Sequence, residues 1–437
     1  MFFSDKRKLI ILDDDPTGMQ TVHDCLALTR WEQADLLFAL SDEVHFFFLL
    51  TNTRALSRDK ARQVIQQAVK NVMEAARLLN VETLFLFRSD STLRGHFPLE
   101  LDTIIKTSHL HYDARFFIPA FFEGNRVTDN DTHYIKLNEG LIPCDETEFS
   151  QDSVFGYSDA YLPKYIQEKS GKTIQAESVV SIKREMLDGS HNDPLHQTLQ
   201  ELKENQYVIV NCLNYKELNC FFISATEAMK LGKHFIFQTA ASAVKSFTQC
   251  DDIPPVVIKN SNSAPGLIIV GSHVTKTTKQ LKILQQEGQN LAPIEIDAQL
   301  VLHDSDTYFE QIIKQAESDF LKGLNPLLYT SRRELSFPSI DKRQEAGMYI
   351  SNFLTKIIND FPRKPAFVIA KGGITSHDIL AKGLKVPISR VLGQASPGVP
   401  ILKMPSEHRW SGMVYVIFPG NVGEDDTLKK VYQAITR

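Results

Sequence analysis

The sequence predicts an α/β protein with two domains, each a mainly parallel sheet covered by helices. Its 437 residues exceed what one typical hydrophobic core holds. Short, continuous apolar runs alternate with segments of helical periodicity, a pattern typical of parallel strands that are buried on both faces. A break rich in Pro, Asn and Ser, residues 249–266, divides this series. We therefore expect domains over residues 1–248 and 267–437, with a linker between them.

The first series opens with a β-α-β unit. Between two apolar runs, Ala61, Ile65 and Ala68 recur at helical spacing after Ser57, a residue type that caps helices. From about residue 126 to residue 200 the pattern weakens and polar turn residues dominate, which indicates an inserted loop region. The expected strands of this domain are residues 8–12, 45–50, 83–87, 115–119, 207–212 and 234–238.

The second series has the same alternation. Its expected strands are residues 267–270, 293–296, 327–331, 367–370 and 414–419, and its expected helices are one from Thr275, two near 306–322 and 344–360, and one from Ser376. In open parallel sheets, ligands bind beyond the carboxyl ends of the strands. The polar stretches at these strand ends are therefore the candidate sites in both domains.

Composition narrows the range of functions. The net charge of −5 and the pI of about 6.2 leave no basic excess for nucleic acid. Apolar runs such as FFFLL are far shorter than the ~20 residues that span a bilayer, and the opening MFFSDKRKLI lacks the apolar core of a signal peptide. The five cysteines include no CxxC pair, which is typical of reduced thiols. We expect a cytoplasmic protein that binds neither nucleic acid nor membranes.

Three polar stretches follow strands of the first domain: DDDPTG, TNTRALS and RSDSTLRGH, which begin at residues 13, 51 and 88. They combine carboxylates and hydroxyls with several arginines. Arginine holds carboxylates bidentately, and Asp and hydroxyl side chains suit sugar hydroxyls. The set therefore predicts a pocket for a small hydroxylated acid. The alternative is that the arginines only cap strands and offset the charge of Asp13, Asp14 and Asp15.

The polar stretches of the second domain are rich in glycine. GSHVTKTTKQ and KGGITSHD follow two strands, and PGVP and PGNVGEDD add two further turns, starting at residues 271, 371, 397 and 419. Backbone N–H groups in a glycine-rich turn at a helix N-terminus cradle phosphate, so these turns predict a nucleotide site. The alternative is that Gly372, Gly373 and Gly423 only permit positive φ angles in tight turns.

The opening stretch has a second interpretation. Asp13-x-Asp15-x-Thr17 after an apolar strand fits the DxDxT signature of haloacid dehalogenase phosphatases, in which the first Asp attacks phosphorus. Those enzymes also need a paired-acid motif at a later strand end to hold magnesium. The acidic pair at 251–252 lies in the expected linker and the pair at 425–426 follows a glycine turn, so the full set is not assembled.

The chain resembles the four-carbon acid sugar kinase family along nearly its whole length. Asp14 and Asp15 match the acidic pair of the family's first motif, although Pro16 and Met19 depart from it. The segments NTRAL, DSTLRGH, PAFFEGNRVT and DETEFSQD resemble family motifs in the first half, and VGSHVTKTTKQ, KGGITS, SPGVP and GNVG resemble its nucleotide-binding segments in the second. Ile374 and Pro419 depart from the usual nucleotide motifs.

The resemblance implies ATP- and Mg²⁺-dependent phosphorylation of a terminal hydroxyl on a threonate, an erythronate or a 3-oxo-tetronate, with the active site in the cleft between the domains. The implied substrate-binding residues are Thr17, Arg54, Asp90, Ser91, Arg94, Gly95 and Arg126. The implied nucleotide-binding residues are Ser272, Gly372, Gly373, Ile374, Thr375, Gly398, Gly420 and Gly423. No metal ligand is assigned, and a homodimer is the oligomeric state we expect.

The acidic run then has a chemical explanation. Phosphoryl transfer depends mainly on positioning and charge stabilisation, with one carboxylate accepting the proton of the attacking hydroxyl. Asp15, closest to the turn, is the base we expect, with Asp14 next. Two other functions stay open: an aspartyl phosphatase built on Asp13 and Asp15, which would need no ATP, and a non-catalytic sensor of small acids, which would turn nothing over.

Overall fold

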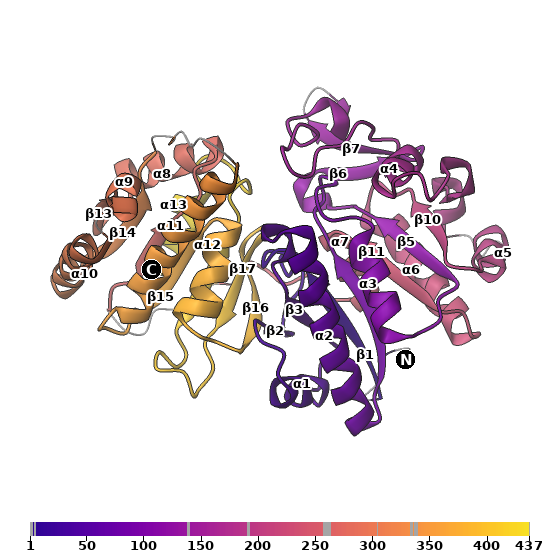
Figure 1. Cartoon of the computed structure of the whole chain (residues 1–437), viewed down its shortest axis with the longest axis horizontal. Helices are drawn as coiled ribbons and strands as arrows, with labels where there is room; N and C mark the ends of the chain where they lie inside the picture. Colours follow the sequence, from indigo (N-terminus) through magenta and orange to yellow (C-terminus); the bar gives the residue numbers. More distant parts are fainter. Residues whose placement is uncertain are drawn as a thin grey trace. The chain divides into compact units, whose positions relative to one another are not determined.

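The chain folds into two compact units in the computed structural model, which describes residues 3, 6–137, 140–189, 193–256, 264–303, 305–332, 335 and 340–436 (Figure 1). The first unit comprises Met1–Asp252 and the second Ile253–Arg437. Residues 257–263 of the expected linker lie outside the described residues.

The first unit is organised around a sheet of parallel strands in the order β2-β3-β1-β4-β11-β5-β10-β9. Its strands are β1 (Arg7–Asp13), β2 (Leu26–Leu28), β3 (Phe46–Leu50), β4 (Glu82–Arg88), β5 (Ala114–Ile118), β9 (Val180–Ile182), β10 (Gln206–Val210) and β11 (Phe235–Thr239). The strands expected from the apolar runs are present, and short β2 and β9 are added at the edges. Their few residues carry too weak a pattern to be recognised in the sequence.

Helices cover both faces of this sheet (Figure 1). On one face α1 (Gln33–Leu40) packs against α2 (Arg58–Leu79), and α2 packs against α3 (Leu99–Ser108). On the other face α6 (Tyr215–Lys230) packs against α7 (Ala241–Thr248). Ser57 is the N-cap residue of α2, as its position in the sequence suggests.

The region expected to be an inserted loop contains regular structure of its own. It holds the antiparallel sheet β6-β7-β8, two helices and four single-turn helices. These elements are η2 (Phe122–Gly124), β6 (Arg126–Asp129), β7 (Thr132–Leu137), β8 (Gly140–Pro143), η3 (Cys144–Glu146), α4 (Leu162–Lys169), η4 (Ala176–Ser178), η5 (Arg184–Leu187) and α5 (Asp193–Glu201). A further single-turn helix, η1 (Thr53–Ala55), lies outside the insertion, between β3 and α2. The insertion packs on the main sheet through a cluster that includes Phe97, Phe117 and Tyr165.

The second unit has a mixed sheet in the order β13-β14-β12-β15-β18-β17-β16, parallel from β13 to β18 and antiparallel from β18 to β16. Its strands are β12 (Leu267–Val270), β13 (Leu291–Ile296), β14 (Asn325–Thr330), β15 (Phe367–Lys371), β16 (Ile388–Ser396), β17 (Val399–Lys403) and β18 (Val414–Phe418). The antiparallel pair β16–β17 is absent from our sequence prediction, because its residues do not form one continuous apolar run.

Helices also cover both faces of the second sheet. One group is α8 (Thr275–Glu287) with α13 (Thr427–Thr436), and the other is α9 (Ala298–His303), α10 (Ser305–Leu321), α11 (Ile340–Asp360), α12 (Gly373–Asp378) and the π-helical turn η6 (Ile379–Gly383). The helix expected from Ser376 begins three residues earlier. Gly372 permits this early start, because its φ of 122° turns the chain directly from β15 into α12.

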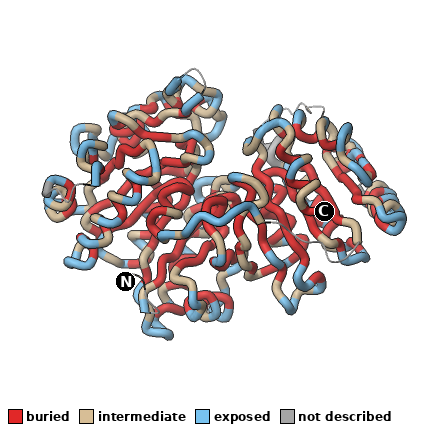
Figure 2. Tube along the Cα trace, turned by 180° about the vertical axis from the view of Figure 1, so that it is seen from behind, coloured by how far each residue is buried: buried red, intermediate tan, exposed pale blue. Residues whose placement is uncertain are grey.

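The cores lie between the sheets and these helices, and strands such as β3, β11, β15 and β18 are buried along their whole length (Figure 2). In the second unit, Ile268, Ile369 and Val416 on adjacent strands pack with Leu284 of α8 and Val431 of α13. Rigid strands buried in this way fix the loops at their carboxyl ends, which is where the sequence places the candidate sites.

Candidate functional site

Three loops of the first unit start at one edge of the sheet. Strand β1 lies between β3 and β4, and Asp13 pairs in register with both Leu50 and Arg88. The backbone links the loops further: the Thr51 N–H donates to the Asp13 carbonyl at 2.9 Å, and the Asp14 N–H donates to the Arg88 carbonyl at 3.2 Å. The predicted site residues on these loops are therefore brought together by the sheet.

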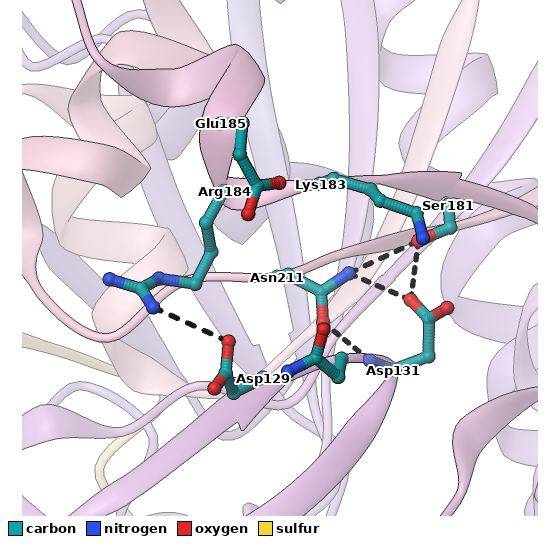
Figure 3. A pocket seen from close by; sticks show the side chains of 8 residues that line it. Asp129, Asp131, Ser181, Lys183, Arg184, Glu185 and Asn211 are labelled. Atoms are coloured by element: carbon teal, nitrogen blue, oxygen red, sulfur yellow. Dashed lines mark hydrogen bonds and ion pairs between the residues drawn. The ribbon is translucent and has the colours of Figure 1, made fainter.

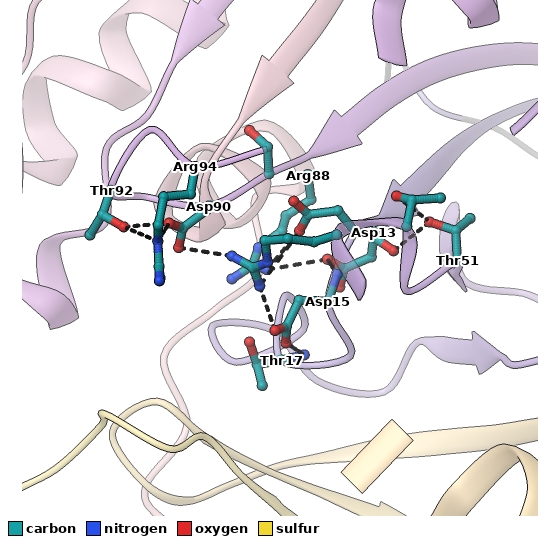
Figure 4. Close-up of polar contacts among 12 residues, drawn as sticks. Asp13, Asp15, Thr17, Thr51, Arg88, Asp90, Thr92 and Arg94 are labelled. Carbon is teal, nitrogen blue, oxygen red and sulfur yellow. Dashed lines mark hydrogen bonds and ion pairs between the residues drawn. The ribbon is translucent and has the colours of Figure 1, made fainter. Parts of the chain in front are cut away.

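Arg54 is the centre of an ion-pair network across these loops. Its guanidinium pairs with Asp15 and lies 3.0 Å from Asp90, whose other oxygen accepts from Arg94 Nε at 2.8 Å and from the Thr92 hydroxyl (Figure 4). Burial raises the pKa of Asp90, but Arg94 and Arg54 outweigh it and hold this pKa below its ordinary value. The network therefore keeps Asp90 ionised and fixes both arginine forks.

Asp15 is ionised for the same reason. Burial alone would raise its pKa. The charges of Arg54 and Arg88 and the hydrogen bonds from Thr17 have a larger, opposite effect, so the pKa lies below its ordinary value. The Thr17 N–H donates to Asp15 at 2.9 Å. A carboxylate held in this way is a weak base, since the groups that stabilise its charge oppose protonation.

Asp13 points into the protein. Its side chain is fully buried, one oxygen lies 3.3 Å from Arg88 Nη1, and a side chain at Gly18 would collide with the carboxylate. Burial raises its pKa to about 8 against the opposing charge of Arg88. A nucleophilic carboxylate must be ionised, and this raised pKa favours the protonated form of Asp13 at neutral pH, which argues against the aspartyl phosphatase interpretation.

Asp14 differs from both neighbours. It is only 1% exposed, and neither carboxylate oxygen has a hydrogen-bond partner among the described residues. Arg54 and Arg88 lie 3.8 and 3.7 Å from one oxygen, beyond hydrogen-bond distance. Burial raises the pKa of Asp14 to about 6, although both arginines oppose the shift. A base for chemistry near neutral pH needs a pKa in this range.

Arg126 has unused hydrogen-bonding capacity. One of its terminal nitrogens donates to the Gly124 carbonyl. Its Nε–H group is buried and has no hydrogen-bond acceptor among the described residues. Burial lowers the pKa of Arg126, and the charge of Asp90 opposes this shift. A buried N–H without an acceptor is costly, so an anionic ligand here would stabilise the arrangement.

The inserted region holds the loop that carries Ser91 and Arg94. His133 Nε2 lies 2.8 Å from the Ser91 carbonyl, the Tyr157 hydroxyl donates to the Thr92 carbonyl at 3.0 Å, and the Tyr165 hydroxyl donates to the Leu93 carbonyl at 2.7 Å. All three side chains are buried. The insertion, whose sequence suggests only a loop, therefore supports the backbone of the DSTLRGH segment.

A small cavity lies elsewhere in this unit, near the ends of β9 and β10 (Figure 3). Asp131, Ser181 and Asn211 line it and hydrogen-bond to one another, with Asn211 Nδ2 2.7 Å from Asp131 Oδ1. Asn211 also accepts from the Asp131 N–H. Because these groups satisfy one another, the cavity is explained by the hydrogen bonds that hold the insertion to the sheet edge.

The glycine-rich turns of the second unit also follow adjacent strands, β12, β15 and β18. The N–H groups of Gly271 and Ser272 donate to the Lys371 carbonyl at 3.1 and 3.2 Å, and the Gly372 N–H donates to the Phe418 carbonyl at 2.8 Å. The Thr277 hydroxyl donates to the Gly420 carbonyl at 2.8 Å. The turns at 271–274, 372–375 and 419–423 therefore form one cluster.

Glycine is required where these turns touch. A Cβ at Gly420 would lie 2.9 Å from Ser272 Oγ, and one at Gly372 would lie 3.0 Å from Ser272 Cβ, both too close for ordinary packing. Gly423 has a φ of 84°. The positive φ angles of Gly372 and Gly423 agree with the alternative drawn from the sequence, and with the close packing at Gly372 and Gly420 they are sufficient to explain these glycines, whether or not phosphate binds there.

Other predicted nucleotide-site residues have different surroundings. Gly373 is half-buried at the start of α12, Thr375 is buried, and Ile374 is 54% exposed. Gly398 belongs to the turn between β16 and β17, where its N–H donates to the Gln394 side chain at 2.8 Å. Gly398 is thus part of the β16–β17 hairpin. It takes no part in the hydrogen bonds given above that join the turns at 271–274, 372–375 and 419–423.

Lys371 was not among the residues predicted from the sequence, yet it lies beneath this cluster. It is fully buried, and its Nζ donates to the carbonyls of Pro419 and Gly420 at 2.6 and 3.3 Å. Burial, assisted by the charge of Lys276, lowers its pKa to about 6. Its place directly before the paired glycines was the available signal, because the last residue of a buried strand is fixed next to the site.

Among the described residues, no group of three or more His, Cys, Asp or Glu side chains is arranged to hold a metal ion. No described helix combines the length and apolarity needed to cross a bilayer. The cytoplasmic location and the homodimer stay predictions from the sequence.

Comparison with protein families gives two matches that divide the chain as the fold does. Residues 9–247 match a sugar-binding N-terminal domain, and residues 267–428 match a nucleotide-binding C-terminal domain. A chain of this class therefore carries one domain for a sugar-like ligand and another for a nucleotide. The protein belongs to the family with this architecture, the four-carbon acid sugar kinase family. A comparison with curated proteins gives no match.

Two crystal structures share the fold over nearly the whole chain. The first is protein HI1011 of Haemophilus influenzae, from a family of unknown function, with a TM-score of 0.63 and 16% identity over 98% of this chain and 100% of that one. The second, from Salmonella typhimurium LT2, is described as a "putative tRNA synthase" and has a TM-score of 0.68 and 15% identity over 97% of this chain and 98% of that one. At such low identity the likeness establishes the fold alone.

Proposed function

We propose that this protein transfers the γ-phosphoryl group of ATP to a terminal hydroxyl of a four-carbon acid sugar. The observation that carries the proposal is Asp14, a buried carboxylate without a hydrogen-bond partner among the described residues, set beside arginine forks in a sugar-binding domain. The same chain has a nucleotide-binding domain. A base, cation-lined surroundings and a nucleotide are the components that phosphoryl transfer to an alcohol needs.

The arginines give the preference for an acid. Arg54 and Arg94 are held by Asp15 and Asp90, so their remaining N–H groups have fixed directions. Arg126 has a buried Nε–H group without a hydrogen-bond acceptor among the described residues. We assign the carboxylate of the acid sugar to Arg126 and Arg94, because a carboxylate supplies acceptors to two arginine donors at once.

Asp14 is the base in this proposal, in place of Asp15, which the sequence suggested first. The pKa of Asp14 is raised to about 6, chiefly by burial, whereas that of Asp15 is lowered by its arginine partners. Asp14 accepts the proton of the substrate hydroxyl as the hydroxyl oxygen forms a bond to the γ-phosphorus. The bond between that phosphorus and the β–γ bridging oxygen breaks, and ADP leaves with the bonding electrons.

The second unit binds the nucleotide in this proposal. The turns at 271–274, 372–375 and 419–423 are assigned to the phosphates, since backbone N–H groups at such turns suit anions. Mg²⁺ enters as part of the Mg–ATP substrate, because a kinase metal is held largely by phosphates and waters with one or two carboxylates. We assign no protein ligand to this metal ion.

The test is an assay of ADP release with a library of four- and five-carbon sugar acids, ATP and magnesium. We expect ADP to appear with at least one four-carbon acid and mass spectrometry to show that acid with one added phosphate. Release of inorganic phosphate from sugar phosphates without ATP would favour the phosphatase instead. Binding of an acid without turnover under any condition would favour the sensor.

A further inference from the structure

A second buried carboxyl group, Glu100, lies next to the proposed base. Glu100 is the second residue of α3 and is fully buried. Its Oε1 accepts from the His96 N–H at 2.7 Å, while its Oε2 has no hydrogen-bond partner among the residues described. Two carboxyl groups that are buried so close to one another without mutual hydrogen bonds need an explanation.

Gly95 lies between these two carboxyl groups. A Cβ placed on it would be 3.5 Å from Glu100 Oε1 and 3.7 Å from Asp14 Oδ2, and apart from the adjacent Arg94 and His96 no other described residue would have a heavy atom within 4 Å. Both distances are ordinary van der Waals contacts. Because Gly95 has no side chain, the space beside its Cα is open on the side that faces an oxygen of each carboxyl group, and we call this space the gap. Gly95 itself is half-buried, so the gap is not sealed.

We propose that this gap is a hydroxyl subsite, in which one hydroxyl group of the acid sugar lies between Asp14 and Glu100. The inference rests on the proposed function, because it names the part of the same ligand that Glu100 recognises. It makes Glu100 a specificity-determining residue that distinguishes a hydroxylated acid from its deoxy form.

The chemistry of the gap suits a hydroxyl group better than the alternatives. A hydroxyl has one donor hydrogen and two acceptor lone pairs, so it bonds best to one proton acceptor and one proton donor. Burial raises the pKa of Glu100 to about 8 and that of Asp14 to about 6. At neutral pH the pair therefore retains one proton, and it provides one proton donor and one proton acceptor. A methyl group in the gap would leave the Asp14 carboxyl group without any hydrogen bond from the described residues, which is costly in a buried site.

The first test fills the gap. Gly95→Ala puts a methyl group into the gap, where it would crowd a bound hydroxyl group, and Gly140→Ala is the control. Gly140 has a similar positive φ of 129°, against 151° for Gly95, but a Cβ there meets nothing within 4 Å. Calorimetry measures binding of threonate, erythronate and the dihydroxybutyrates that each lack one hydroxyl, to the full chain without ATP.

We expect Gly95→Ala to weaken binding of the hydroxylated acid by at least about tenfold, the effect of losing one hydrogen bond to a charged group. One dihydroxybutyrate should bind weakly to the unmutated protein and with the same weak affinity to Gly95→Ala, because it lacks the hydroxyl group that the methyl group displaces. Gly140→Ala should leave all affinities unchanged. Equal weakening of every acid in Gly95→Ala, or no weakening, overturns the subsite.

The second test removes the carboxyl group and keeps the proposal falsifiable if Gly95→Ala does not fold. Glu100→Leu should reduce the preference for the hydroxylated acid over that one dihydroxybutyrate by about tenfold. Glu100→Gln should restore the preference, because its amide oxygen can still face His96 and the gap. A purely structural role would change stability without changing this preference, and a preference unaltered in Glu100→Leu contradicts the inference.

The two proposals fail in different ways. If the unmutated protein binds an acid sugar with the expected deoxy pattern but forms no ADP, the kinase proposal is wrong and the subsite stands. If ADP forms and Gly95→Ala shows no deoxy-selective effect, only the subsite is wrong. If no acid of the series binds to the unmutated protein, both are wrong.

Discussion

The two candidate sites occupy equivalent places in their sheets but are built from different material. In the first unit, charged side chains beyond β1, β3 and β4 are buried together, and several have strongly shifted pKa values. In the second unit, the turns beyond β12, β15 and β18 pack backbone against backbone, with glycine where a Cβ would collide. Side-chain chemistry is thus concentrated in the first unit and backbone geometry in the second.

This difference teaches what substitutions should do in each unit. A conservative change of one charged side chain in the first unit alters protonation or hydrogen bonding while leaving the backbone in place. A change at a glycine turn in the second unit alters the space that a nucleotide would need. Four expectations sharpen the comparison, and the first is the largest.

Asp14→Asn should reduce kcat at least ~100-fold, the lower range for losing a general base. The fold and the affinity for ATP should change little, because Asn has the same shape and ATP is assigned to the other unit. Steady-state kinetics and ATP calorimetry measure the two effects. Asp15→Asn should act mainly on the KM for the acid, since Asp15 is paired with Arg54. Normal kcat in Asp14→Asn would exclude it as the base.

Gly373→Asp should abolish ATP binding. A carboxylate at this half-buried turn adds both bulk and negative charge where phosphate is expected. The matched control is Gly347→Asp in α11, where a Cβ meets nothing within 4 Å. Calorimetry with folded protein decides the question: normal ATP affinity in Gly373→Asp would show that the phosphates bind elsewhere.

Arg94→Lys should raise the KM for the acid sugar by about tenfold and leave ATP kinetics unchanged. Lysine keeps the charge but loses the planar fork that Asp90 holds in direction. The estimate is the typical effect of one lost charged hydrogen bond. An unchanged KM for the acid would remove Arg94 from the binding site and leave Arg126 as its main arginine.

Much of the fold could be predicted from the sequence because buried parallel strands have a continuous apolar pattern. Runs such as KLIIL and HFFFLL correspond to β1 and β3 within one or two residues. The strands of the insertion and β16 could not be found in this way, since half-exposed strands lack continuous runs. The neighbouring β17 is buried, but Pro400 interrupts its short apolar run.

The predicted site shows a similar division. Asp14, Asp15, Arg54 and Asp90 are brought together by adjacent strand ends, as the motif order suggested. The separate states of Asp13, Asp14 and Asp15 could not be predicted, because each depends on which way its side chain points and on residues distant in sequence. Lys371 was overlooked for a different reason: a lysine after an apolar strand is usually solvated, and only the tertiary packing buries it.

The smallest expected effect concerns stability and Lys371. Its pKa in the folded protein is about 6, below the ordinary value of 10.5, so between these values the unfolded chain binds a proton that the folded chain does not. Its contribution to the free energy of unfolding therefore increases as pH rises from about 6 toward 10. Lys371→Met removes that contribution, so the Tm of the variant minus that of the unmutated protein should decrease across this range. Lys279→Met, at an exposed position on α8, should show a difference that does not vary with pH. A pH-independent difference for Lys371→Met would mean that Lys371 remains charged when buried, held by the carbonyls of Pro419 and Gly420.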